Sequence, residues 1–341
     1  VHYALKANFD PRVLGLIKDG GIGADCVSGN EVKKAVEVGF SPAKVVFAGV
    51  GKSDREINEA LDLDIFCFNV ESIQELQIID ALAGAKGKKA KVAIRINPNV
   101  DAKTHKNITT GLEENKFGIN QWELHRCADV LKESENLEFV GIHFHVGSQI
   151  LDLDVFKSLC VKVNEIHQWF EERGFQLKVL NVGGGLGVDY HQPDNKAIVD
   201  FDAYFRIFDQ FLNRKPGQEV HFELGRAIVA QCGSLISRVL YVKNGLKKNF
   251  LILDAGMTEL MRPMLYQAYH KIEKISADDS EITKYDVVGP ICESTDCFGK
   301  EVELPKSERG DLFAIRTAGA YGQVMASRYN LREQLEVAYS E

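Results

Sequence analysis

Short apolar runs alternate with longer amphipathic stretches over the first two thirds of the chain. Compact apolar runs are typical of strands, and apolar residues spaced by three and four are typical of helices. This pattern predicts eight strands, at residues 1–7, 22–27, 44–50, 65–70, 91–97, 137–146, 177–182 and 219–224. A predicted helix follows each of the first seven: 11–19, 30–38, from 53, 72–82, from 121, 154–173 and 201–213.

Eight strands that alternate with helices are the pattern of a closed (β/α)8 barrel. An open, doubly wound sheet is the alternative, but the turn after the first strand lacks the Gly-x-Gly-x-x-Gly fingerprint of that fold. After about residue 230, strands are predicted at 235–243, 250–254, 285–288 and 312–316, with one short helix near 260–268. We therefore predict an α/β protein with a (β/α)8 barrel over residues 1–228, followed by a β-rich domain over residues 229–341.

Composition narrows the possible functions. The 341 residues are 45% hydrophobic and 26% charged, which is typical of a globular protein, and the net charge of −8 argues against a nucleic-acid partner. No apolar run approaches the roughly 18 residues that a membrane span needs, so we expect no membrane association. Seven scattered cysteines without Cys-x-x-Cys spacing argue against disulfides and zinc and favour the cytoplasm.

Polar residues and glycines gather where the predicted barrel strands end. The active site of such a barrel lies at the carboxyl ends of its strands, and the loops after strands 7 and 8 commonly bind phosphate. Three successive glycines follow strand 7, and their backbone N–H groups could surround an anion, although a simple tight turn is the alternative. These strand-end residues are Lys6, Asp25, Arg95, His145, Ser148, Gly183, Gly184, Gly185, Glu223, Gly225 and Arg226.

Lys6 lies among small apolar residues, where its charge is disfavoured and its amine becomes a nucleophile. A lysine, a phosphate-binding loop and the carboxylate of Glu223 together indicate pyridoxal 5′-phosphate, which needs a Schiff-base amine, a phosphate site and an acid at its ring nitrogen. A surface lysine is the plainer alternative. His145 could stack on a flat cofactor, pack in the core, or bind a metal with His143, but no third ligand is evident. We interpret His143 as packing.

Nine short motifs in this order resemble those of the fold-type III pyridoxal-phosphate decarboxylases, and the match runs across nearly the whole chain. Five lie in the predicted barrel: His2-Tyr3-Ala4-Leu5-Lys6-Ala7-Asn8, Asp25-Cys26-Val27-Ser28, His145-Val146-Gly147-Ser148-Gln149, Asn181-Val182-Gly183-Gly184-Gly185-Leu186-Gly187 and Glu223-Leu224-Gly225-Arg226. Four lie in the second domain: Asp254-Ala255-Gly256-Met257, Arg262-Pro263 with Leu265-Tyr266, Gly289-Pro290-Ile291-Cys292-Glu293-Ser294 and Gly319-Ala320-Tyr321-Gly322.

The resemblance implies a role for each of these residues. Lys6 would form the Schiff base, Glu223 would pair with the ring nitrogen, and Cys292 would donate a proton. The remaining cofactor contacts would be Asp25, Arg95, His145, Ser148, Gly183, Gly184, Gly185, Gly225, Arg226 and Tyr321. The substrate contacts would be Arg226, Arg262, Tyr266, Glu293 and Tyr321, with Glu293 at the distal amine. No metal is implied.

The implied reaction is decarboxylation of meso-2,6-diaminopimelate to L-lysine, the last step of lysine biosynthesis. In the family the Cys-Glu loop serves the partner's active site, so a homodimer is expected. An ornithine or arginine decarboxylase is an alternative, although ornithine enzymes typically have aspartate where Glu293 stands. A racemase is less favoured, because it would have arginine near the ring nitrogen rather than Glu223. Leu224 replaces the family's usual proline, and we expect a further segment before Val1 and a tail after the last residue.

Overall fold

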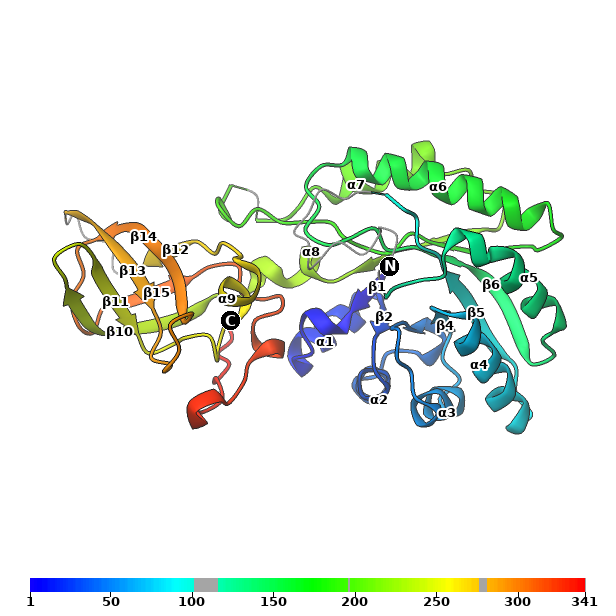
Figure 1. Ribbon diagram of the computed structural model, residues 1–341, viewed down its shortest axis with the longest axis horizontal. Coiled ribbons are helices and arrows are strands. Elements are labelled where there is room, and N and C mark those ends of the chain that lie inside the picture. Colours follow the sequence, from blue (N-terminus) through cyan, green and yellow to red (C-terminus); the bar gives the residue numbers. More distant parts are fainter. Residues whose placement is uncertain (101–115, 196, 276–280, 341) are drawn as a thin grey trace. The chain divides into compact units, whose positions relative to one another are not determined.

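The computed structural model describes residues 1–100, 116–195, 197–275 and 281–340 (Figure 1). The chain divides into two compact units. The first, here called the barrel unit, comprises Val1–Gly187 and Asp200–Gly225. The second, the β unit, comprises Val188–Val199 and Arg226–Glu341. The short segment Val188–Val199 thus groups with the β unit, although it lies between two barrel elements in the sequence.

Among the described residues, nine parallel strands form the sheet of the barrel unit, in the order β8-β7-β6-β5-β4-β3-β2-β1-β9. Phe222 alone separates β8 from β9, so these two strands are halves of one eighth strand. β8 pairs with β7 and β9 pairs with β1, where His2 lies opposite Glu223, and this closes the predicted barrel. The bounds are β1 His2–Ala4, β2 Gly23–Cys26, β3 Val45–Phe47, β4 Cys67–Val70, β5 Ala90–Arg95, β6 Leu137–His143, β7 Val179–Asn181, β8 Glu219–His221 and β9 Glu223–Leu224.

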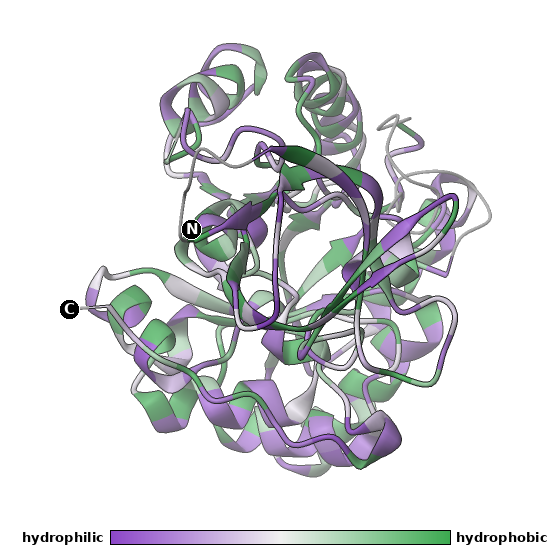
Figure 2. Ribbon diagram, turned by 90° about the vertical axis from the view of Figure 1, so that its left-hand side faces the viewer, coloured by the Kyte–Doolittle hydropathy of each residue, from purple (hydrophilic) through white to green (hydrophobic). Residues whose placement is uncertain are grey.

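Helices surround the barrel strands (Figure 1), and hydrophilic and hydrophobic residues alternate along them (Figure 2). Their starts follow from local chemistry: Ser53 and Glu56 form a reciprocal capping box, and a serine or aspartate side chain caps several others. The bounds are α1 Pro11–Asp19, α2 Gly29–Val38, α3 Asp54–Asp62, α4 Ile73–Ala85, α5 Leu124–Glu133, α6 Asp154–Glu171 and α7 Phe201–Phe211. No helix in the described ranges is long and apolar enough to cross a membrane.

Several strands end earlier than the sequence predicts, and two of these differences place a site residue beyond its strand. The first strand ends at Ala4 rather than at residue 7, and a single 3₁₀ turn, η1 (Leu5–Ala7), carries Lys6. The sixth strand ends at His143 rather than at residue 146, so His145 lies in the loop that follows. Both residues therefore lie beyond the carboxyl ends of their strands.

The β unit contains a six-stranded mixed sheet in the order β12-β15-β10-β11-β13-β14. Its buried core includes Leu251, Val287 and Phe313. Two of its strands, β12 and β14, were not predicted. In β14, a glycine and exposed charged residues interrupt the apolar pattern, and its pairing with β13 contains register shifts. The bounds are α8 Arg226–Val229, β10 Leu235–Asn244, β11 Asn249–Leu253, α9 Arg262–Tyr266, β12 Ile272–Lys274, β13 Ile282–Val288, β14 Cys297–Pro305 and β15 Leu312–Ile315.

Candidate active site

Glu223 is buried inside the barrel, and its carboxylate accepts three hydrogen bonds from three other strands. Asn69 on β4 and Asn181 on β7 donate to Oε1 over 2.8 and 2.7 Å. Nε2 of His143, at the end of β6, lies 2.8 Å from Oε2. Burial alone would raise the pKa of Glu223, but His143 and the hydrogen bonds outweigh burial and hold this pKa below its usual range. The carboxylate is therefore kept ionised.

Asp25, on β2, is a second buried carboxyl group in the barrel. Its environment raises its pKa, whereas that of Glu223 is lowered. Burial and the charge of Glu223 raise the pKa of Asp25 well above its usual range, although the charge of Lys6 opposes this. Its Oδ1 has no hydrogen-bond partner among the residues that the structure describes. The barrel thus holds two buried carboxyl groups whose pKa values are shifted in opposite directions, and Asp25 keeps one oxygen without a hydrogen-bond partner in the described residues.

Lys6 occupies a turn that small residues bring close to the eighth strand. Leu5 and Ala7, on either side of it, are buried, whereas Lys6 is half-buried. A Cβ added at Gly225 would lie 2.9 Å from the Cβ of Ala7 and 3.1 Å from that of Ala4, so larger residues at these three positions would push the segments apart. The charge of Lys6 lowers the pKa of Asp25, which places the amine within electrostatic reach of that carboxyl group.

His145 carries a neutral ring in the loop after β6. Burial lowers its pKa well below the usual range, and the charges of Arg95 and Lys6 lower it further. The backbone N–H of Gly184 approaches its Nδ1 at 3.4 Å, which orients the ring relative to the glycine loop. A neutral, oriented imidazole is suited to contact with a flat aromatic ring.

Arg95, the last residue of β5, is anchored by an acidic residue that the sequence analysis did not single out. Its Nη1 lies 2.7 Å from Oε1 of Glu71, and both side chains are buried. Glu71 also accepts hydrogen bonds from the backbone N–H groups of Gly49 and Gly118, each at 3.0 Å. The Arg95–Glu71 pair thus ties together the loops after β3, β4 and β5. The sequence did contain a signal for Glu71, because this charged residue directly follows an apolar strand.

The three glycines after β7 allow a backbone approach that no other residue would permit. Gly183 and Gly185 have φ angles of +70° and +107°, in the left-handed region that favours glycine. A Cβ on Gly184 would lie 2.0 Å from the carbonyl oxygen of Glu223. The N–H groups of Gly183 and Gly184 already bond to Asn181 Oδ1 and His145 Nδ1, so these glycines also brace the site itself. Ser148 is half-buried in the neighbouring loop, after Gly147.

Two buried arginines form a cluster within the β unit. Arg226 donates from Nη1 to the Tyr190 hydroxyl over 2.7 Å, and its guanidinium lies 4.8 Å from the ring centroid of Tyr321. Arg262 lies 4.7 Å from the Tyr190 ring centroid and donates to Nε2 of His270 over 2.8 Å. Burial and the charge of Arg262 lower the pKa of His270 to about 4, so its ring is neutral. Guanidinium groups held by these neutral partners are suited to an anionic ligand.

Cys292 and Glu293 are exposed on a loop of the β unit, and Tyr266 ends α9. The loop is shaped by Asp296, which is buried and accepts hydrogen bonds from the backbone N–H groups of Met257 and Ile291 over 2.6 and 2.8 Å. The sequence analysis missed Asp296, and it also missed Tyr190 and His270. Nothing in the local pattern distinguishes them, since each lies in a segment without regular secondary structure.

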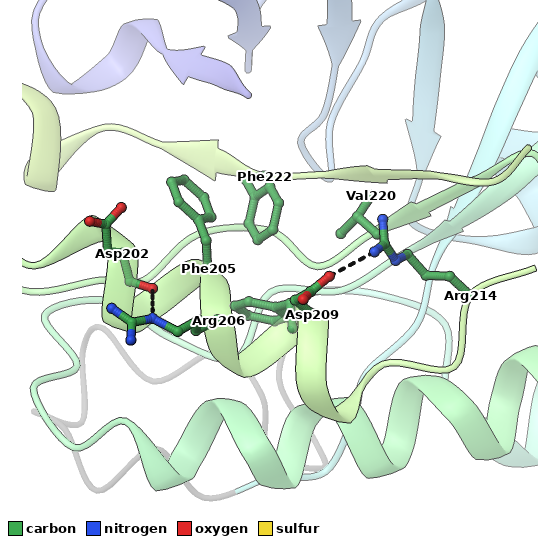
Figure 3. Close-up of a pocket in the computed structure, with 8 residues that line it drawn as sticks. Asp202, Phe205, Arg206, Asp209, Arg214, Val220 and Phe222 are labelled. Atoms are coloured by element: carbon green, nitrogen blue, oxygen red, sulfur yellow. Dashed lines mark hydrogen bonds and ion pairs between the residues drawn. The ribbon is translucent and has the colours of Figure 1, made fainter.

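A separate groove of about 490 Å³ lies on the outer side of the barrel, between α7 and β8 (Figure 3). Phe205, Phe208, Val220 and Phe222 form its apolar lining, and an ion pair between Arg214 and Asp209 lies at its edge. α8, the helix after the eighth strand, has only four residues. The groove contains none of the predicted site residues.

The residues inside the barrel fit pyridoxal phosphate. An amine, a carboxylate kept ionised, a neutral imidazole and a glycine loop are grouped there, and Asp25 keeps a buried oxygen unpaired. No group of three or more potential metal ligands occurs in the described ranges. A closed parallel barrel with this set of groups defines a barrel-type pyridoxal-phosphate enzyme.

Comparisons with known proteins agree with that class. Residues 1–230 match the model of the pyridoxal-dependent decarboxylase pyridoxal binding domain. Diaminopimelate decarboxylase of Bacteroides thetaiotaomicron is 58% identical over 98% of this chain and 86% of its own length. That of Aquifex aeolicus is 42% identical over 97% and 78%. The crystal structure of the Helicobacter pylori enzyme complexed with L-lysine is 46% identical, covers 96% of this chain and 82% of its own, and has a TM-score of 0.90.

The chain belongs to the diaminopimelate decarboxylase family of pyridoxal-dependent carboxy-lyases. This confirms the predicted fold class, with its barrel and second sheet, and the predicted cofactor, pyridoxal 5′-phosphate.

Proposed function

We propose that this protein decarboxylates meso-2,6-diaminopimelate to L-lysine, as the last step of lysine biosynthesis in the cytoplasm. The observation that carries the reaction type is the ionised Glu223, held by three hydrogen bonds inside the barrel. The substrate is supported by the relatives, which are named diaminopimelate decarboxylases, and by the L-lysine bound to the Helicobacter pylori enzyme.

The barrel residues have distinct roles in this proposal. Pyridoxal phosphate, when bound, supplies a Schiff base for the substrate amine and a ring that takes up the electron pair left by departing CO₂. Lys6 supplies the amine that holds the cofactor. Glu223 keeps a proton on the ring nitrogen, and His145 presents its neutral ring to the cofactor plane. Arg95, Asp25, Ser148 and the loop Gly183–Gly185, with Gly225, complete the cofactor contacts.

The β unit residues act on the substrate. Arg226, Arg262, Tyr266 and Tyr321 bind its carboxylate, and Arg226 and Tyr321 also contact the cofactor. Two buried guanidinium groups with neutral partners support this assignment. Cys292 returns a proton to the α-carbon after CO₂ departs, because a thiol is a suitable general acid. Glu293 binds the distal ammonium group.

We also propose a homodimer in which subunits share active sites. The exposure of Cys292 and Glu293 supports this, since residues that complete a partner's site must be reachable from outside their own subunit. In this proposal residues 1–228 bind the cofactor, and residues 229–341 supply the substrate-binding and dimer-contact loops.

The deciding experiment is CO₂ release measured side by side with meso-diaminopimelate, ornithine and arginine. We expect release from diaminopimelate alone. Preference for ornithine or arginine would overturn the substrate assignment, and interconversion of stereoisomers without CO₂ release would indicate a racemase.

Two variants test the residue roles. Lys6→Ala should be colourless and inactive, because the yellow colour requires the link between this amine and the cofactor; a yellow Lys6→Ala protein would contradict the assignment. Glu293→Ala should lose diaminopimelate turnover far more than cofactor binding, and an unchanged rate would exclude its role at the distal amine.

A further inference from the structure

We propose that His143 is a positioning residue that fixes Glu223 toward the ring nitrogen of pyridoxal phosphate and keeps that nitrogen protonated. This inference rests on the proposed pairing of Glu223 with the ring nitrogen. It replaces the interpretation of His143 as a packing residue.

The hydrogen bonds of Glu223 leave one defined place for the ring nitrogen. An ionised carboxylate accepts about four hydrogen bonds, roughly two on each oxygen. Asn69 and Asn181 occupy both positions on Oε1, and Nε2 of His143 occupies one on Oε2. The remaining position is on Oε2, so the ring nitrogen and His143 would share one oxygen atom. The orientation of Oε2 is therefore set by His143.

Packing alone does not explain a histidine at this position. The side chain of His143 is 1% exposed, and its Nδ1 has no hydrogen-bond partner in the described part of the chain. An unpaired buried nitrogen costs free energy that an aliphatic side chain would avoid. The hydrogen bond from Nε2 of His143 to Glu223 is the interaction that offsets this cost. A carboxylate can only accept, so Nε2 carries the hydrogen.

The burial of Glu223 makes the hydrogen bond from His143 more important. Burial inside the barrel disfavours the charge of Glu223. His143 is the largest of the influences that oppose burial and keep Glu223 ionised. Without the histidine, we expect Glu223 to take up the proton more readily, which leaves the ring nitrogen without an anionic partner.

Three substitutions separate the hydrogen bond from the volume of the side chain. His143→Gln places an amide nitrogen as many bonds from Cβ as Nε2 of histidine, so it can still donate to Oε2. His143→Asn carries the same amide one bond shorter and cannot reach as far. His143→Leu removes the donor altogether. If His143→Leu does not fold, the comparison of His143→Gln with His143→Asn is enough to test the hydrogen bond.

The measurement is the ¹⁵N NMR shift of the ring nitrogen in protein loaded with ¹⁵N-labelled pyridoxal phosphate, which reports protonation independently of turnover. We expect a protonated nitrogen in the wild type and in His143→Gln, and a shift toward the unprotonated form in His143→Asn and His143→Leu. A hydrogen bond to a charged group corresponds to a change of about tenfold to a hundredfold. We therefore expect kcat for diaminopimelate to fall by about that factor in Asn and Leu, with KM within about twofold.

Two controls distinguish the possible failures. His167→Gln changes another histidine–carboxylate contact, with Glu171 on α6 outside the barrel, and should leave the ring nitrogen unchanged. Glu223→Gln should deprotonate it. If Glu223→Gln shifts the signal but His143→Asn and His143→Leu do not, His143 has no such role and the proposed function stands. If Glu223→Gln also leaves it protonated, the pairing itself is wrong, and the inference fails with it.

Discussion

Replacing Gly184 with alanine tests how closely the glycine loop and the eighth strand must approach. The new Cβ would lie 2.0 Å from the carbonyl oxygen of Glu223, whereas such contacts essentially never fall below 3.0 Å. The backbone of one segment must therefore move by about 1 Å. The obstacle is main chain rather than a flexible side chain, and the hydrogen bond from Glu223 N to Gly183 O, at 2.8 Å, opposes the movement.

Overpacking of this kind costs about 1–3 kcal/mol, and we expect the upper end because two backbone segments collide. A displacement of about 1 Å at a reacting group can also lower the rate about a hundredfold. We therefore expect Gly184→Ala to lose about 3 kcal/mol of unfolding free energy in urea and to bind pyridoxal phosphate more weakly in titrations of the apoprotein.

Gly15 provides the matched control. It lies inside α1, and a Cβ added there would have no heavy atom within 4 Å. Gly15→Ala should raise the unfolding free energy by about 0.5–1 kcal/mol, since alanine is the better helix residue. If Gly184→Ala were as stable as the wild type and bound the cofactor equally well, the argument from backbone approach would be refuted.

Two further predictions concern buried charges. Glu71→Gln leaves the guanidinium of Arg95 buried without its carboxylate and should lower the unfolding free energy by about 3 kcal/mol or more in urea; a loss below about 1 kcal/mol would mean that water or another group compensates. His270 takes up its proton near pH 4 in the folded protein but near pH 6.5 when unfolded, so stability should fall as the pH drops between these values, by up to about 3 kcal/mol. His270→Gln should reduce that fall, and an unchanged pH profile would contradict it.

The barrel could be predicted from the sequence because its strands and helices are local. Several helices begin at a serine or aspartate cap and most strands are short, largely apolar runs, so the alternation is visible without tertiary contacts. The end of the first strand could not be placed in the same way. Residues 1–7 contain no glycine or proline, and the turn that carries Lys6 lies against Gly225, more than 200 positions later in the sequence.

In the candidate site, too, residues marked by local sequence features were predicted, and residues defined by distant contacts were not. Lys6, Glu223 and the glycine run stood out because charged residues and glycines mark strand ends. The residues that orient Glu223 were missed, although a signal was present. Asn69 and Asn181 are amides inside otherwise apolar strands, and His143 was interpreted as packing. A polar residue in a fully buried strand requires a partner, but the sequence does not say which one.

The eighth strand also sets the order in which the site can form during folding. His2 and Glu223 are paired, so the last seam of the barrel joins residues from the two ends of that unit. Contacts this distant in sequence require the largest loop closure and form slowly. During synthesis, Lys6 leaves the ribosome long before Glu223, so the site cannot be complete until the eighth strand has emerged. Uptake of the yellow cofactor would therefore report completion of the barrel, which makes colour a direct assay of folding yield.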